Sequence, residues 1–192
     1  MFILKPYIFN KFKNIIFGFS TRFSKNTNSP YGFNLSYSVG DDREIVEKNR
    51  KEFFEQIGLS DDSISFQRQI HSDIIQIVDC SGDCGQSDAL ITNKKGLGLA
   101  VIIADCTPIF IYDNKNRIIA AVHSGWRGTE QNILGKTLDE LSNDFNSKPG
   151  ELNVYIGPSI SQNNYEVGDE VAAKFDNKYL HRNERKYLLD VS

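Results

Sequence analysis

The stretch ADCTPIFIYDNKNRIIAAVHSGWRG, residues 104–128, places two apolar segments on either side of a polar turn. The two segments, 109–113 and 117–122, are rich in β-branched and aromatic residues, which is typical of strands. They are apolar on both faces, which is typical of strands covered from both sides. The DNKN sequence at 113–116 is typical of a tight turn. We therefore expect a central hairpin, with Cys106 and His123 at strand ends on the rim of a sheet.

Strand-like and helix-like segments surround this hairpin without a strict β-α-β order. Short apolar, β-branched segments predict strands, and apolar residues at helical spacing predict helices. The predicted strands cover 14–22, 64–70, 74–79, 98–104 and 153–157, and the predicted helices cover 41–57, 129–145 and 169–175. The polar stretch 24–30 reads as a surface loop. This order predicts an α+β fold in a single domain, with a mixed sheet or two packed sheets flanked by helices.

Composition narrows the functional classes. The 192 residues carry a net charge of -3 and no block of Lys or Arg, so nucleic acid is not an expected partner. The apolar runs are too short to span a bilayer, and the N-terminus lacks the pattern of a secretory signal, so no membrane partner and a cytoplasmic location are expected. Three cysteines argue against a disulfide framework. These features favour a small-molecule partner for a monomer or a small homo-oligomer.

Three residues with metal-binding side chains follow apolar, strand-like segments: His71, Cys106 and His123. Two imidazoles and one thiolate match a catalytic zinc site, in which three protein ligands leave the fourth position open. Their spacing is not a local zinc-finger pattern. On spacing alone, the simpler explanation of a core-edge cysteine and two hydrogen-bonded histidines is favoured over a metal site.

A second interpretation makes Cys106 a nucleophile that is activated by His123. Asp105 or Asp88 would then orient the imidazole. This arrangement, typical of a cysteine hydrolase or transferase, needs only one histidine, so the position of His71 distinguishes it from the zinc site. A third interpretation is a non-catalytic module that binds a metal or a nucleoside.

The segment HSGWRGTE, residues 123–130, combines small residues with an arginine at the start of a predicted helix. Backbone N–H groups near Gly128 and Thr129 are expected to face an anion, phosphate above all. Arg127 would add a bidentate contact. An alternative fits the local sequence equally well: Trp126 fills the edge of the core and Arg127 pairs with a surface carboxylate.

The other cysteines and the third histidine receive no predicted role. Cys80 and Cys84 lie in a turn-like segment rich in Gly, Ser and Asp, and His181 lies in the polar run HRNERK. Both settings are typical of solvated surface.

Several stretches together resemble the YfiH family, a group also known by laccase-domain and polyphenol-oxidase names. The resemblance covers nearly the whole chain, and the ADC, HSGWRG and IGP elements occur in the family's order. The matching stretches are STRFS (20–24), PYGFNLSYSVGDD (30–42), QIHSD (69–73), SDALIT (87–92), ADCTPIFIYD (104–113), AAVHSGWRGT (120–129) and YIGPSISQNNYEVG (155–168).

The resemblance implies a zinc site formed by His71, Cys106 and His123, within a central β-sandwich flanked by helices. It also implies purine nucleoside phosphorylase activity: adenosine, inosine, guanosine or methylthioadenosine reacts with phosphate to give the base and a pentose 1-phosphate. Adenosine deaminase activity is implied as a second reaction. As a hypothesis, Asn34, Gln69 and Arg50 complete the substrate pocket beside Arg127, Gly128 and Thr129.

Two expectations qualify the resemblance. A copper laccase is not expected, because a multicopper cluster needs several times more imidazoles than the three histidines of this sequence. Family members also continue past the LLDVS sequence at 188–192 through another helix and strand. Residues 1–192 are therefore expected to form one YfiH-like domain that lacks the family's C-terminal segment.

Overall fold

The structure is a computed structural model of the chain, and it describes residues 2–23, 30–183 and 186–191. Residues 24–29 of the predicted surface loop lie outside the described part. The chain divides into two compact units, Met1–Ile64 and Ser65–Ser192. Both helices and strands are present, so the predicted α+β class is confirmed. Among the described residues, no helix is both long enough and apolar enough to cross a membrane.

The first unit is built around helix α2 (Arg43–Gln56), which buries Val46, Phe53 and Phe54. The helix begins after Asp42, whose carboxylate accepts a hydrogen bond from the Glu44 N–H at 2.8 Å. The capping residue is therefore Asp42, one residue after Asp41, with which the predicted helix starts. The predicted strand 14–22 forms only as β2 (Phe19–Ser20), paired antiparallel with β1 (Ile3–Leu4). Helix α1 (Tyr7–Asn10) and the 3-10 turn η1 (Asp61–Ser63) complete this unit.

A five-stranded sheet forms the centre of the second unit, in the order β10-β8-β9-β6-β4. The predicted hairpin is confirmed, because β8 and β9 pair antiparallel from Thr107 opposite Ser124 to Asp113 opposite Ile118. Within this sheet, β4 and β6 pair in parallel and the other neighbouring strands pair antiparallel. The bounds are β4 (Ile75–Ile77), β6 (Ala89–Thr92), β8 (Thr107–Asp113), β9 (Ile118–Ser124) and β10 (Leu152–Ile156).

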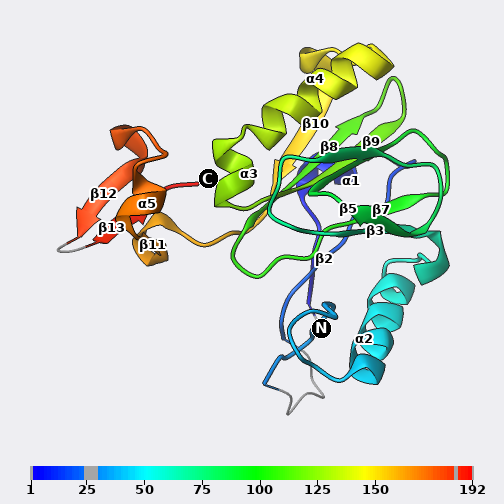
Figure 1. Cartoon of the computed structure of the whole chain (residues 1–192). Helices are drawn as coiled ribbons and strands as arrows, with labels where there is room; N and C mark the ends of the chain where they lie inside the picture. The colour runs from blue at the N-terminus through cyan, green and yellow to red at the C-terminus, as the bar shows by residue number, and fades with distance from the viewer. Residues whose placement is uncertain (1, 24–29, 184–185, 192) are drawn as a thin grey trace. The chain divides into compact units, whose positions relative to one another are not determined.

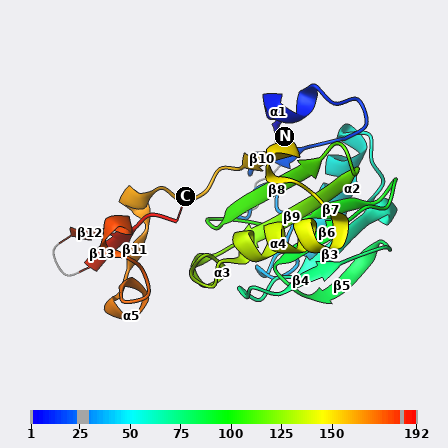
Figure 2. The same ribbon diagram turned by 90° about the horizontal axis from the view of Figure 1, so that it is seen from above.

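The two faces of this sheet are covered by different elements (Figures 1 and 2). Helix α4 (Ile133–Phe145) lies across one face and inserts Ile133 and Leu141 into the main core. The second sheet, of strands β5 (Gly82–Gln86), β3 (Ile64–Arg68) and β7 (Gly98–Ala100), lies on the other side (Figure 1). Burying each large aliphatic side chain contributes about 1.5–3 kcal/mol, so this double cover explains why both faces of the hairpin are apolar.

The C-terminal part of the second unit carries a small sheet, β11-β13-β12. Its own apolar cluster contains Val167, Val171 and Leu189, and Trp126 packs against that cluster. The elements are η2 (Pro149–Glu151), η3 (Gln162–Asn164), β11 (Glu166–Val167), α5 (Asp169–Ala172), η4 (Asn177–Tyr179), β12 (Leu180–Asn183) and β13 (Lys186–Leu189).

Three sequence predictions need correction in this unit. The single helix predicted from Thr129 is two helices, α3 (Trp126–Glu130) and α4. Asn132 separates them in the left-handed conformation, and its side chain caps α4. The predicted strand 98–104 ends at Ala100, and the segment 82–86, read as a loop, is strand β5.

Candidate metal centre

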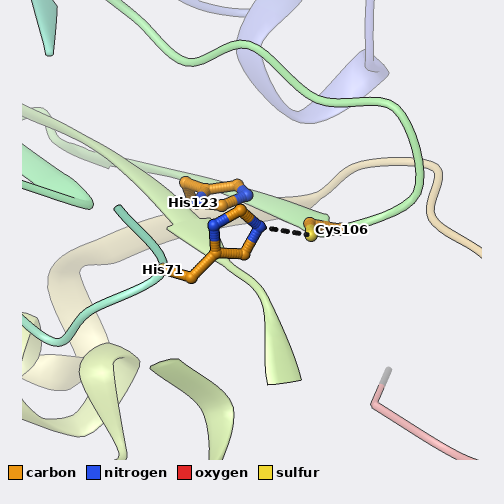
Figure 3. Close-up of side chains that lie close together, drawn as sticks. All are labelled: His71, Cys106 and His123. Atoms are coloured by element: carbon orange, nitrogen blue, oxygen red, sulfur yellow. Dashed lines mark hydrogen bonds between the residues drawn. The ribbon is translucent and has the colours of Figure 1, made fainter. Parts of the chain in front are cut away.

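His71, Cys106 and His123 come together at one end of the β8–β9 hairpin (Figure 3). Their ligand atoms all lie within 4.8 Å of one another, and the Cys106 Sγ is 3.9 Å from the His71 Nε2. Zinc binds imidazole nitrogen and thiolate sulfur at about 2.0–2.3 Å, so two ligand atoms on one ion lie about 3–4 Å apart. The cluster therefore has the donors of a metal site, and its ligand atoms lie close to the spacing that one ion requires.

Each of these side chains comes from a different kind of local structure. His123 lies in β9 and is buried, while Cys106 directly precedes β8 and is half-buried. His71 is exposed on the loop between β3 and β4, with a φ of 57°. A left-handed conformation outside glycine costs about 1–3 kcal/mol and persists where neighbouring contacts hold it.

The contacts that hold His71 come from Asp88, a fully buried residue directly before β6. Its carboxylate accepts hydrogen bonds from the His71 N–H at 3.1 Å and from the Ser72 N–H at 2.6 Å. The Ser72 hydroxyl donates to it at 2.7 Å. The same carboxylate pairs with the His123 Nδ1 at 2.7 Å, so a single acidic residue positions two of the three ligands.

This pairing determines which nitrogen of His123 can bind a metal. Because Nδ1 donates to Asp88, Nε2 is the nitrogen available to the cluster. A carboxylate behind a ligating imidazole is the usual support of a zinc-bound histidine. Asp88 therefore has the position expected of an orienting group for a metal ligand.

Burial and hydrogen bonding act in opposite directions on the pKa values here. Burial lowers the pKa of His123, but hydrogen bonds with Asp88 and Cys106 outweigh it and raise the pKa to about 9. Burial raises the pKa of Asp88, and its bonds with His123 and Ser72 outweigh that effect, so the net pKa is lowered. For His71, burial and the neighbouring His123 both lower the pKa. A bound metal cation would take the place of the proton on the His123 Nε2, since a ligating imidazole must be neutral.

Gly125 lets the His71 ring and the Cys106 thiol pack closely against the main chain. A Cβ atom at this position would lie 2.8 Å from the His71 Cδ2 and 3.3 Å from the Cys106 Sγ. Its φ of -74° is accessible to any residue, so space and not backbone conformation requires glycine. The donor chemistry and the ligand spacing of the cluster fit a metal ion.

The residues predicted to bind phosphate lie within α3. Arg127 is exposed and stacks on the Trp126 ring at 4.2 Å, and its charge acts on His71. Gly128 is buried, with its Cβ position 3.0 Å from the Ser72 carbonyl oxygen. The Thr129 N–H donates to the Gly125 carbonyl at 2.9 Å. The prediction that this N–H faces an anion is therefore corrected, because it is bonded within the helix.

The other predicted substrate residues have main-chain partners. The Gln69 side-chain amide bonds to both backbone groups of Ile102. Asn34 and Arg50 lie in the first unit, where the Asn34 amide donates to the Ser36 carbonyl at 2.9 Å and the Arg50 Nε donates to the Leu35 carbonyl at 2.8 Å. Substrate contacts by these three residues stay predictions.

The remaining thiols and the third histidine lie outside the cluster. Cys80 is exposed, Cys84 is half-buried, and His181 is exposed on β12. Among the described residues, the cluster of His71, Cys106 and His123 is the only group of three such ligands within reach of one ion.

Sequence reasoning gave an incomplete account of the residues around the cluster. It considered Asp88 only beside a nucleophile, and it gave no role to Ser72 or Gly125. A lone acid at the start of the buried strand ALIT (89–92) was the available signal for Asp88. Tyr165 was also missed: burial raises the pKa of its phenol, and the charges of Cys106 and Arg127 act on it.

Known proteins resemble this chain in sequence and in structure. A purine nucleoside phosphorylase of Corynebacterium glutamicum is 38% identical over 165 residues, which are 83% of this chain and 67% of that protein. A purine nucleoside phosphorylase of Clostridium acetobutylicum is 36% identical over 88% of this chain and 67% of its own length. The chain thus spans about two thirds of the length of these relatives.

Solved structures agree with the sequence relatives. The crystal structure of the Bacillus licheniformis protein YfiH matches with a TM-score of 0.84 and 27% identity, over 91% of this chain and 72% of that one. YlmD from Geobacillus stearothermophilus matches with the same TM-score, 26% identity and the same coverage. The family described as multi-copper polyphenol oxidoreductase laccase matches residues 16–192. This chain belongs to that family, whose structural relatives include YfiH.

Proposed function

We propose that this protein is a zinc-dependent purine nucleoside phosphorylase. The observation that carries the proposal is the convergence of His71, Cys106 and His123 on one point, in a chain whose named relatives are purine nucleoside phosphorylases. The substrates would be a purine nucleoside and phosphate, and the products a purine base and a pentose 1-phosphate.

The donor set supports zinc over copper. Two imidazoles and a thiolate suit zinc, and three protein ligands leave a position open for a reacting group. A multicopper centre needs more histidines than the three in this sequence. A blue-copper site usually adds an axial methionine, and the only methionine here is Met1. The family's laccase description is therefore not proposed as the activity of this chain.

When bound, zinc would supply a Lewis acid that polarises an oxygen of the substrate or of water. The chain's own residues have separate tasks. Asp88 holds the Nδ1 proton of His123, and Gly125 lets His71 and Cys106 pack closely against the main chain. The exposed guanidinium of Arg127 is available for phosphate, which it can bind with two parallel hydrogen bonds. In phosphorolysis the bond from C1′ to the purine nitrogen breaks, a bond from C1′ to a phosphate oxygen forms, and the purine takes up a proton.

A second candidate is a cysteine hydrolase or transferase. The specific observation in its favour is that Cys106, His123 and Asp88 are linked in the order of a nucleophile, a base and an orienting acid. The approach of the His71 Nε2 to the same sulfur favours the metal site, because a cysteine nucleophile does not need a second imidazole.

The test is turnover of adenosine, inosine, guanosine and methylthioadenosine by zinc-loaded protein, with products separated by chromatography. We expect base and pentose 1-phosphate only when phosphate is present, and loss of the activity after chelation or in Cys106→Ala. Inosine formed from adenosine without phosphate would show deamination as well. Activity that survives chelation but not thiol alkylation would instead support the cysteine enzyme, and bound zinc without turnover would support a binding module.

A further inference from the structure

We propose that Gln69 is a positioning residue of the metal centre, whose side-chain amide fixes the segment that carries Cys106. The inference rests on the metal site proposed above, and it gives Gln69 a role other than substrate binding. It follows from how residues 101–106 are held.

This segment has no regular secondary structure. It connects the end of β7 at Ala100 with the start of β8 at Thr107, where a sheet ladder would otherwise hold the main chain. Among the described residues, two sets of hydrogen bonds hold its main chain. The Asp105 carbonyl accepts a hydrogen bond from the Ile160 N–H at 2.9 Å, and Ile102 pairs with Gln69.

The contact between Gln69 and Ile102 is two-sided. The Gln69 Nε2 donates to the Ile102 carbonyl at 2.7 Å, and the Ile102 N–H donates to the Gln69 Oε1 at 2.8 Å. A side-chain amide thus takes the place of a neighbouring strand for this one residue. Only a primary amide at this reach supplies both a donor and an acceptor, so the contact is specific for glutamine.

Gln69 lies two residues before His71, in the same loop that Asp88 holds. Asp88 accepts from the N–H groups of Ile70, His71 and Ser72 and pairs with His123. The loop 69–72 is therefore connected to His123 through Asp88 and to the Cys106 segment through Gln69. Loss of the Gln69 contact would leave the thiol without one of its two anchors while the two histidines stay in place.

A nucleoside contact would compete with this arrangement. Both polar atoms of the Gln69 amide already have short main-chain bonds across 33 residues of sequence. Substrate binding would have to share or break these bonds, whereas positioning uses them as they stand.

The test compares Gln69→Glu and Gln69→Leu in a chain whose Cys80 and Cys84 are replaced by serine, so that Cys106 is the only thiol. Gln69→Glu keeps the shape and the acceptor but loses the donor, which makes it the milder variant if Gln69→Leu folds poorly. Gln76→Leu is the matched control, because the Gln76 Nε2 makes a single exposed hydrogen bond to the Gln86 carbonyl.

Three measurements are made on each folded protein: the zinc dissociation constant by chelator competition, the thiolate-to-cobalt charge-transfer band of the Co²⁺ form, and the rate of Cys106 alkylation in metal-free protein. For both Gln69 variants we expect zinc binding to weaken by about 10–100-fold, the cobalt band to fall, and the alkylation rate to change. The control should match its parent in all three.

Unchanged zinc affinity, cobalt band and alkylation rate in Gln69→Glu, with a raised KM for the nucleoside, would overturn the proposal and restore Gln69 to the substrate pocket. If the parent protein binds neither zinc nor cobalt, the proposed metal site fails. The alkylation rates then still decide whether Gln69 positions Cys106, since that measurement needs no metal.

Discussion

A buried aspartate lies at each end of the β8–β9 hairpin: Asp113 within the hairpin at its turn, and Asp88, which precedes β6, beside its open end. Only the open end has the features of a functional site. Asp113 at the turn accepts hydrogen bonds from the Ser147 hydroxyl at 2.6 Å and from the Asn116 N–H at 3.0 Å. Asp88 at the open end accepts from Ser72 and pairs with His123. Burial and hydrogen-bond satisfaction are similar, so neither property alone distinguishes the site.

The difference lies in the kind of partner. Every partner of Asp113 is a main-chain, amide or hydroxyl group whose bonding capacity is used to close the turn. The imidazole of His123 has a second nitrogen, available to Cys106 and His71. A buried carboxylate thus supports chemistry when it holds a group with a further binding atom, and it supports only the fold when it does not.

The largest expected effect comes from removing a ligand at the open end. Cys106→Ala and His123→Ala should reduce bound zinc from about one ion per chain to nearly none, because only two of the three protein ligands remain. Elemental analysis by plasma mass spectrometry measures this directly. Cys84→Ser is the control and should keep the zinc; equal zinc in Cys106→Ala would exclude the thiol from the site.

Replacing each of the two aspartates with asparagine, one at a time, tests the comparison between the two ends. Asp88→Asn should weaken zinc binding by about 10–100-fold, because it removes the carboxylate that orients His123. Asp113→Asn should leave the zinc dissociation constant unchanged. Competition with a chromogenic chelator measures both variants. Equal zinc affinities in the two variants would remove the distinction between the two ends.

Gly125→Ala should have a smaller effect on zinc binding than Asp88→Asn. The added methyl group would press against His71 and Cys106, so these side chains must shift by a few tenths of an ångström. The same competition assay measures the change. Gly150→Ala is the control, since a Cβ there meets no atom within 4 Å. An unchanged zinc affinity in Gly125→Ala would show that the space at Gly125 is not needed.

Asp113→Asn, at the turn, is expected to have the smallest effect on zinc binding and a clear effect on the stability of the fold. Burial raises the pKa of Asp113, but bonds from Ser147 and Asn116 outweigh it, so the net pKa lies below the ordinary value of 3.8. A lowered folded-state pKa adds stability above pH 3.8 that is lost as the pH falls through the folded value. Asp113→Asn should therefore lower the free energy of unfolding near neutral pH by about 1–3 kcal/mol.

Urea unfolding at several pH values checks this prediction. The difference in the free energy of unfolding between wild type and Asp113→Asn should become smaller as the pH falls below about 4. A gap that is independent of pH would show that the Asp113 charge does not stabilise the turn.

The hairpin was predictable from sequence because its two apolar segments and the polar turn between them are local features of the sequence. Residues 109–113 and 118–122 are apolar on both faces, and the DNKN turn separates them. Strand β5 was not predictable in this way. Its sequence, GDCGQ, has the composition of a loop, and its strand conformation comes from pairing with β3, beginning at Ser65 opposite Gly82.

The site shows the same division between local and long-range causes. The three ligands were named from residue type and from the family resemblance. Their supports depend on contacts across long stretches of sequence: Asp88 is 35 residues from His123, and Gln69 is 33 residues from Ile102. Neither contact leaves a periodic pattern in the sequence. The left-handed conformation of His71 was likewise invisible, because the residue that holds it, Asp88, is 17 residues away in the sequence.

X-ray absorption spectroscopy at the zinc edge of zinc-loaded protein tests the central claim most directly. The account predicts one sulfur at about 2.3 Å and two imidazole nitrogens at about 2.0–2.1 Å, with the sulfur absent in Cys106→Ala. A zinc ion surrounded only by oxygen and nitrogen in the wild-type protein, or an unchanged sulfur contribution in Cys106→Ala, would contradict it.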